Sequence, residues 1–342
     1  MAELLRFTER GIYCEQGDFF IDPWRPVSHA VITHAHADHA RWGSRYYLAH
    51  HHSREILKLR LGADIRLTTI EYGESVMRNG VEVTLFPAGH IYGSAQVRVA
   101  YKGEVWVVSG DYKTEADGFS GVFEPVKCHT FITESTFGLP VFRWQPQAEV
   151  MTEINNWWRQ NQREGKTSIL TAYALGKAQR LISSVDASIG RIYVHGAVAN
   201  VNEALERDGA QLPETIRVTA DIDKKDYAGN LVITPASGLG TSWIRKFSPY
   251  DTAMVSGWMQ IRGMKRRRAV QRGFVLSDHA DWEGLNEAVD ATGAERVFVT
   301  HGYQSVFARY LTDKGYEAKE VITEYEGEQP QSEDQTAVTE TT

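Results

Sequence analysis

The sequence predicts an α/β protein in which one domain interrupts another, and two changes of pattern support this prediction. Short β-rich runs alternate with polar turns in the first part of the chain, whereas helix–strand alternation begins near Gln147. The first pattern returns near Gly273. An insertion of roughly 130 residues between two pieces of a host domain explains this order.

Four short runs in the first part are predicted to be strands because they are rich in β-branched and aromatic residues and are followed by polar residues. They are Val27–Thr33, Val81–Phe86, Val105–Ser109 and Phe131–Thr133. Ser53–Leu61 is a candidate helix between the first two.

The middle of the chain alternates helices with strands, which is typical of a parallel sheet covered by helices. The predicted helices are Glu149–Gln162, Lys177–Val185 and Asn200–Asp208, and the predicted strands are Ser168–Thr171, Ile192–His195 and Leu231–Thr234. Beyond Gly273, strands at Phe274–Ser277 and Val297–Thr300 flank a helix at Trp282–Thr292. We expect the host domain in residues 1–145 and 271–327, the inserted domain in 146–270 and a disordered polar tail in 328–342.

Composition excludes several classes of protein. The chain of 342 residues is 42% hydrophobic and 24% charged, as ordinary globular proteins are, and no run reaches the roughly 20 apolar residues of a membrane span. No secretory signal is evident, and the two cysteines, Cys14 and Cys128, form neither a disulfide framework nor a thiolate metal site. We therefore expect a cytoplasmic protein without a membrane partner. A net charge of −7 argues against a broad electrostatic nucleic-acid binder but allows a local basic groove.

The strongest signal is His34-Ala35-His36-Ala37-Asp38-His39, which directly follows the strand ending at Thr33. Alternate residues of a strand face the same way, so these four polar side chains cannot share one face of a regular strand. On a loop or tight turn they can converge, and they suit two metal ions better than one. Imidazole and carboxylate ligands favour Zn²⁺ or Mn²⁺. The alternative is a histidine-rich surface segment.

Three more candidate ligands follow predicted strands: His90, Asp111 and His301. A side chain just beyond the carboxyl end of a buried strand is well placed to build a site. Each of them alone would more often be structural, but together with the histidine cluster they indicate a metal centre.

The order of these residues resembles the metal-binding motif series of the metallo-β-lactamase fold, and Asp22 resembles the supporting aspartate of that series. Glu134 in ITESTFG, His279 in LSDHAD and His301 in VTHG resemble motifs A, B and C of the β-CASP nucleases. Thr171–Leu181 resembles the helix-entry stretch of their inserted domain. The resemblance implies a metallo-β-lactamase αββα sandwich with an inserted β-CASP α/β domain.

The segments GIYCEQGDFFIDP, PAGHIYGSAQ and VLSDHADW resemble, more narrowly, the bacterial DNA-ligase-associated exonucleases. That resemblance implies a DNA exonuclease of DNA repair, with a DNA ligase or helicase as a functional partner. The residues themselves do not separate DNA from RNA, so an RNA-processing endo- or exoribonuclease is the first alternative. A metallo-hydrolase of small esters or thioesters is another, but it would need neither Glu134 and His279 nor the insertion. A non-enzymatic scaffold fits poorly because every expected ligand position is filled.

The resemblance also implies a role for each residue. His34, His36 and His90 would hold one divalent ion, and Asp38, His39 and His301 the other, with Asp111 bridging. The two ions, Zn²⁺ or else Mn²⁺, would activate a hydroxide for attack on the phosphodiester. His279, held by Glu134, would act as a general acid or orient the phosphate. Asp38 or Asp22 would orient ligands or water.

Substrate contacts are expected at two places. Gly176-Lys177 at a predicted helix start and Ser237-Gly238 in a loop offer N–H groups and a cation to phosphate, although an ordinary cap or turn is an equal alternative. The run Arg262–Arg268, which includes Arg266 and Arg267, leads into motif B, and we interpret it as a basic rim rather than a solvated face.

Other conspicuous residues are interpreted as structural. The triplet His50-His51-His52 is not needed to complete the metal series, and Trp157-Trp158 suits a core-facing helix better than a base-stacking platform. We also expect His29, His129 and His195 to be structural.

Overall fold

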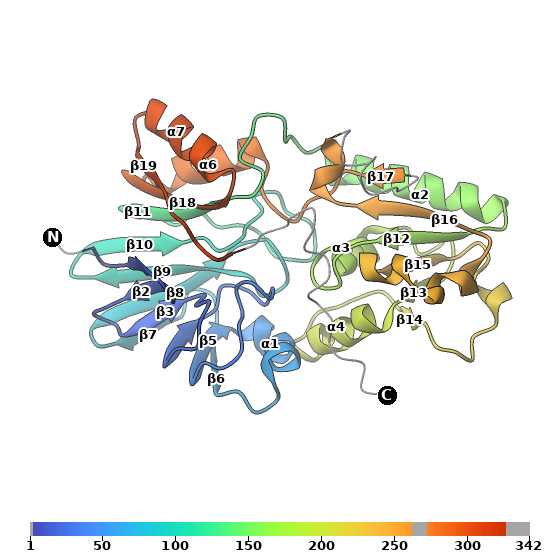
Figure 1. Ribbon diagram of the computed structural model, residues 1–342, viewed down its shortest axis with the longest axis horizontal. Helices are drawn as coiled ribbons and strands as arrows, with labels where there is room; N and C mark the ends of the chain where they lie inside the picture. Colours follow the sequence, from blue (N-terminus) through green and yellow to red (C-terminus); the bar gives the residue numbers. More distant parts are fainter. Residues whose placement is uncertain (1–2, 262–271, 326–342) are drawn as a thin grey trace. The chain divides into compact units, whose positions relative to one another are not determined.

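The computed structural model describes residues 3–261 and 272–325 (Figure 1). Within them, the chain forms two compact units. One comprises residues 3–143 and 279–325, and the other comprises residues 144–261 and 272–278. The fold is α/β, as the sequence predicted.

The first unit contains two sheets. One has the order β1 (Arg6–Thr8), β2 (Gly11–Cys14), β3 (Phe19–Ile21), β4 (His29–Val31), β5 (Tyr46–His50) and β6 (Leu67–Ile70), and is parallel from β3 to β6. The other has the order β19 (Glu317–Glu320), β18 (Arg296–Gly302), β11 (Thr130–Ser135), β10 (Glu104–Val108), β9 (Ala95–Tyr101), β8 (Val81–Pro87) and β7 (Ser75–Arg78). It is parallel from β19 to β10 and antiparallel beyond.

The two sheets pack face to face with helices outside. Ile21 of one sheet and Val97 of the other belong to a single buried core. A second core joins Val107 of the seven-stranded sheet to Leu285 of α6 (Trp282–Thr292) and Leu311 of α7 (Gln304–Asp313). The 3₁₀ helix η1 (His51–Ser53) and α1 (Arg54–Leu61) connect β5 to the parallel β6, which requires a crossover over one face of their sheet. These layers form the predicted αββα sandwich.

The second unit is one parallel sheet. Its order is β14 (Ile216–Arg217), β13 (Ile192–Val194), β15 (Leu231–Thr234), β12 (Thr167–Thr171), β16 (Tyr250–Val255) and β17 (Arg272–Phe274). One face carries α2 (Gln147–Arg163), α3 (Lys177–Ser184) and α4 (Gly196–Arg207). The remaining short helices are η2 (Lys224–Tyr227), η3 (Ala236–Gly240), η4 (Ser242–Phe247) and η5 (Gly257–Gln260), and residues of η2 and η4 cover the opposite face.

The tryptophan pair of α2 belongs to the core of this unit, as predicted. Trp157 and Trp158 are 2% and 0% exposed. Their indole N–H groups donate to Asp251 Oδ2 at 2.8 Å and to the Gly229 carbonyl at 3.0 Å, so both polar atoms are satisfied away from solvent.

Most predicted elements are present, but a helix and a strand have bounds that differ from the prediction. Helix α4 begins at Gly196 because the His195 ring accepts a hydrogen bond from the Ala197 N–H and caps it. The strand predicted at Phe274–Ser277 lies earlier, as β17, and pairs with β16. The division between the units therefore falls at 278/279 rather than at the expected 270/271.

Two expectations fall on residues beyond the structural description. The basic run Arg262–Arg268, with Arg266 and Arg267, and the tail 328–342 lie outside the described residues. Among residues 3–261 and 272–325, no helix has the length and apolar character needed to cross a membrane.

Candidate metal centre

The histidine cluster lies on a tight turn that follows β4. The Asp22 carboxylate anchors the entry to the turn by accepting hydrogen bonds from Thr33 N at 2.8 Å and Thr33 Oγ1 at 2.5 Å. The N–H groups of His39 and Ala40 then donate to the His36 carbonyl at 3.1 and 2.8 Å. This backbone path lets residues 34–39 converge, which an extended strand would prevent.

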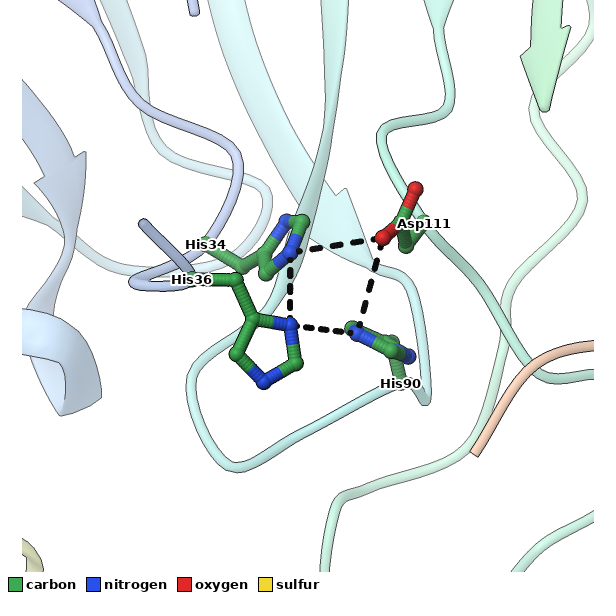
Figure 2. A group of neighbouring side chains, drawn as sticks. All are labelled: His34, His36, His90 and Asp111. Carbon is green, nitrogen blue, oxygen red and sulfur yellow. Dashed lines mark hydrogen bonds and ion pairs between the residues drawn. The ribbon is translucent and has the colours of Figure 1, made fainter. Parts of the chain in front are cut away.

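A first group of candidate ligands consists of His34, His36, His90 and Asp111 (Figure 2). His36 Nδ1 lies 3.1 Å from His34 Nε2 and 3.0 Å from His90 Nε2. Asp111 Oδ2 lies 3.6 Å from His34 Nε2 and 3.8 Å from His90 Nε2. Ligand atoms around a tetrahedral Zn²⁺ stand about 3.3 Å apart. The spacing therefore suits one divalent ion.

A second group consists of His39, Asp111 and His301. Asp111 Oδ1 lies 3.5 Å from His39 Nε2 and 2.8 Å from His301 Nε2, and Asp38 Oδ2 lies 3.6 Å from His39 Nε2. Within the described part of the chain, these buried atoms of His39, Asp111 and His301 are ion-pair neighbours of one another but make no hydrogen bond of good geometry. Buried polar atoms left in this way are costly unless a ligand satisfies them, and a cation among them would do so.

Glu134 and His279 form a third group with Asp111. Glu134 accepts hydrogen bonds from His279 Nδ1 at 2.8 Å, Tyr112 N at 2.9 Å and Thr136 N at 3.2 Å. His279 is 3% exposed, and its ring centroid lies 4.5 Å from that of His90. Glu134 thus fixes the orientation of His279 beside the first group of ligands.

Three of the histidines point Nε2 at the centre because a neighbour holds Nδ1. The pairs are His34 with Thr33 at 3.0 Å, His39 with Asp22 at 2.8 Å and His301 with Thr300 at 3.2 Å. Such contacts fix ring orientation and tautomer, as partners of metal-binding histidines generally do.

Two glycines allow the backbone conformations that place the candidate ligands Asp111 and His301. Gly110, before Asp111, has φ of 58°, and a Cβ there would lie 2.7 Å from the Thr33 side chain. Gly302, after His301, has φ of 87°, and a Cβ there would collide with the Ser135 carbonyl. Both positions need a residue without a side chain.

The charges of the centre favour a cation. Burial raises the pKa of Asp111, but His39, His301 and His279 outweigh it and hold that pKa well below its usual range. Burial lowers the pKa of His39, but Asp111, Asp38 and Asp22 outweigh it and raise the pKa to about 10. The carboxylates thus attract positive charge to His39, where a metal ion would compete with a proton.

The residues expected to hold phosphate lie in the second unit. Gly176 caps α3 with φ of 95°, and Ser237 and Gly238 lie in η3 after β15. Lys177 is only 1% exposed, with Nζ 3.7 Å from Asp278 Oδ2. Residues 171–174, 235, 236 and 255 line a small pocket at the carboxyl ends of β12, β15 and β16, where parallel sheets commonly bind ligands.

The histidine triplet does not belong to any of the three groups of candidate ligands in the described residues. His50 is 1% exposed and its ring stacks on Tyr72, with centroids 3.5 Å apart. Sequence reasoning missed Tyr325, whose ring stacks on His39. A single tyrosine at the edge of a polar segment carries no spacing signal that could have revealed it.

No protein-family model matches the chain. A protein of Opitutus terrae named probable DNA ligase is 28% identical over 311 residues, which is 90% of this chain and 30% of that protein. The endoribonuclease ysh1 of Schizosaccharomyces pombe is 22% identical over 73% of this chain and 39% of its own length. The endoribonuclease YSH1 of Yarrowia lipolytica is 29% identical over 69% of the chain and 35% of its own length. The chain thus spans less than two fifths of these curated relatives.

One solved structure, a protein of unknown function from Enterococcus faecalis V583, superposes with a TM-score of 0.59. The alignment covers 86% of this chain and 79% of that one at 12% identity, so the likeness shows a shared fold alone.

Proposed function

We propose that this chain, whose relatives confirm its resemblance to the β-CASP branch of the metallo-β-lactamase superfamily, is a metal-dependent nuclease that degrades DNA as an exonuclease of DNA repair. The observation that carries the proposal is the Glu134–His279 pair, which meets both groups of metal ligands at Asp111. A hydrolase of small esters would need the metals but not this acid–base pair or the second unit.

We assign two divalent ions to the centre, with Zn²⁺ preferred over Mn²⁺. One would be held by His34, His36, His90 and Asp111, and the other by Asp38, His39, His301 and Asp111. Imidazole and carboxylate donors without a thiolate suit these metals. When bound, such ions neutralise phosphate oxygens and bring the pKa of water close to neutrality.

We assign to His279 the role of the general acid that gives a proton to the leaving oxygen. Because Glu134 accepts the Nδ1 hydrogen, Nε2 is the ring atom that would deliver a proton to that oxygen. The main-chain N–H groups of Tyr112 and Thr136 keep the Glu134 carboxylate in place, so Glu134 is a positioning residue. Asp38 would complete the second metal site and orient the attacking water.

The substrate class follows from the relatives. The chain aligns with 30% of a protein named probable DNA ligase, so a similar segment is part of a protein named for joining DNA. This supports DNA as the substrate and a ligase as a functional partner. We also propose a helicase as an alternative partner and the cytoplasm as the compartment. The relatives named endoribonucleases support RNA processing as the second candidate function.

A further set of residues would bind phosphates of the nucleic acid. We assign this role to Gly176, Lys177, Ser237 and Gly238, and to the basic residues Arg266 and Arg267. Backbone N–H groups at strand and helix ends suit phosphate oxygens, and arginines follow a nucleic-acid backbone.

The test uses single- and double-stranded DNA labelled at either end, and matched RNA, with Zn²⁺, Mn²⁺ or Mg²⁺. We expect metal-dependent DNA degradation that is lost in Asp38→Ala and falls by about 10²- to 10⁴-fold in His279→Ala. His29→Gln is the control, because His29 stacks on Tyr46 and is in none of the three groups of candidate ligands. Cleavage of RNA alone would move the protein to RNA processing, and failure to cleave any polymer would refute the nuclease assignment.

A further inference from the structure

The last described residue, Tyr325, contacts the second group of metal ligands. Its ring lies parallel to that of His39, with centroids 4.5 Å apart and planes at 5°. The same ring meets His301 edge-on at 5.7 Å. Tyr325 is 8% exposed, so this aromatic surface is buried against two histidines of one site.

Tyr325 is also connected to His39 by hydrogen bonds that both residues make with Asp22. Its hydroxyl donates to the Asp22 carbonyl at 3.1 Å, while the Asp22 N–H donates to the Val31 carbonyl at 2.9 Å. Asp22 has φ of 42°, in the left-handed region that is uncommon for residues other than glycine, although aspartate enters it more readily than most. The Asp22 carboxylate in turn accepts from His39 Nδ1 at 2.8 Å.

Neighbouring residues hold Tyr325 in this position. Trp24 packs edge-on against its ring at 5.4 Å. The Glu324 carboxylate binds both terminal nitrogens of Arg25, at 2.5 and 2.8 Å, and Arg41 Nη2 donates to the Glu324 carbonyl at 3.1 Å. The ion pair is exposed and contributes little alone, but its two-point geometry fixes the path of the chain.

We propose that Tyr325 is a positioning residue that orients His39 and thereby sets the affinity of the His39–Asp111–His301 group for its metal ion. The ring stack limits rotation of the imidazole, and the hydroxyl holds the backbone of the aspartate that fixes its tautomer. This inference deepens the proposed function and rests on the metal centre. Loss of a partner that orients a metal-binding histidine typically costs about 10- to 100-fold in affinity.

The experiment measures metal binding rather than activity. Full-length protein is stripped with a chelator, and Zn²⁺ or Mn²⁺ is titrated calorimetrically into wild type, Tyr325→Ala and Tyr325→Leu. We expect two sites in wild type, and in both variants one site weakened by about 10- to 100-fold while the other stays within about threefold. Tyr325→Phe keeps the ring, so it should lose less affinity than Tyr325→Ala at the same site.

Tyr316→Ala is the matched control. Tyr316 lies in the loop between α7 and β19, and its hydroxyl donates to Asp290 of α6 at 2.5 Å, outside the three groups of candidate ligands. It should retain both affinities. If Tyr325→Ala or the bulk-preserving Tyr325→Leu folds and binds both ions as wild type does, the inference is wrong although the proposed function stands. Equal weakening of both sites would also overturn it, since that pattern indicates general destabilisation. A wild-type protein that binds no metal would instead refute the proposed function itself.

Discussion

Both units bury charged side chains near the carboxyl ends of parallel strands, but they compensate those charges differently. In the second unit, Arg180 Nη1 lies 3.1 Å and Lys177 Nζ lies 3.7 Å from the Asp278 carboxylate, and all three side chains are at most 5% exposed. In the first unit, His39 Nε2 and Asp111 Oδ1 are buried without a hydrogen-bond partner in the described chain.

The difference distinguishes a structural cluster from a candidate binding site. Burying a charge is costly unless another group compensates it. The second unit provides the compensation from within, by pairing two cations with one carboxylate and with neighbouring polar groups. The first unit gathers imidazole and carboxylate atoms around Asp111, and a bound cation would satisfy these atoms together. Lys177 therefore has the environment of a structural lysine, and its assignment to phosphate binding stays a prediction.

The largest effect is expected from Asp111→Ala, because Asp111 belongs to all three groups of candidate ligands. We expect the variant to bind less than one equivalent of metal tightly and to lose nuclease activity by at least about 10³-fold, or about 4 kcal/mol of barrier. Metal analysis after dialysis and a DNA degradation assay measure both quantities. Asp117→Ala removes another buried aspartate that binds Ser120, and it should keep its metal. Full metal content in Asp111→Ala would contradict the shared role.

Arg180→Met tests whether the buried charge cluster of the second unit stabilises the fold. Arg180 donates to the Ser277 carbonyl at 2.5 Å and to Gln147 Oε1 at 2.7 Å as well as pairing with Asp278. Removing one partner of a buried ion pair typically costs about 3–5 kcal/mol. We expect that loss in the free energy of urea unfolding, with unchanged metal affinity. Unchanged stability together with weaker DNA binding would instead make Arg180 part of the substrate site.

Gly110→Ala should have an intermediate effect on the metal centre. The added Cβ would lie 2.7 Å from the Thr33 side chain at a backbone φ of 58°, so both Thr33 and Asp111 must move. A displacement of about 1 Å can reduce catalysis by about 10²-fold. The measured quantity is kcat of DNA degradation with saturating metal. Gly118→Ala is the control, since its Cβ would meet nothing within 4 Å and its φ of 81° imposes a similar backbone strain. Equal losses in both variants would assign the effect to strain.

The elements that sequence patterns predicted best are those whose own residues determine them. Trp282–Thr292 and Leu231–Thr234 have the predicted bounds, because an apolar helix face and a buried β-branched run are local signals. Strands β1 and β19, with polar or mixed residues, were not predicted, since they are strands through pairing with β2 and β18. The boundary at 278/279 likewise depends on β17 pairing with β16.

The candidate centre was more predictable than its support. The histidines and aspartates that come together carry a spacing signal, and the structure places them within 4.8 Å in their groups. Thr33 and Thr300 each contact a candidate ligand through a single hydrogen bond, and Tyr325 contacts two of them through its ring. Residue types as common as threonine and tyrosine become recognisable only after folding brings them beside a ligand.

The smallest predicted effect concerns His50, a buried histidine outside the metal groups. Burial, with smaller contributions from His52 and His51, lowers the pKa of His50 to about 3. The unfolded chain, with a histidine pKa of about 6.5, then binds more protons than the folded chain between pH 3 and 6.5, so stability falls as the pH falls through this window.

His50→Asn should remove that dependence while keeping an acceptor for the His52 N–H. Between pH 7 and 5.5, we expect chelator-treated wild type to lose about 1 kcal/mol more unfolding free energy than the variant. Urea unfolding at four or five pH values measures the difference. Identical pH slopes would mean that the pKa of His50 in the folded chain stays near that of the unfolded chain, and would refute its lowering by burial.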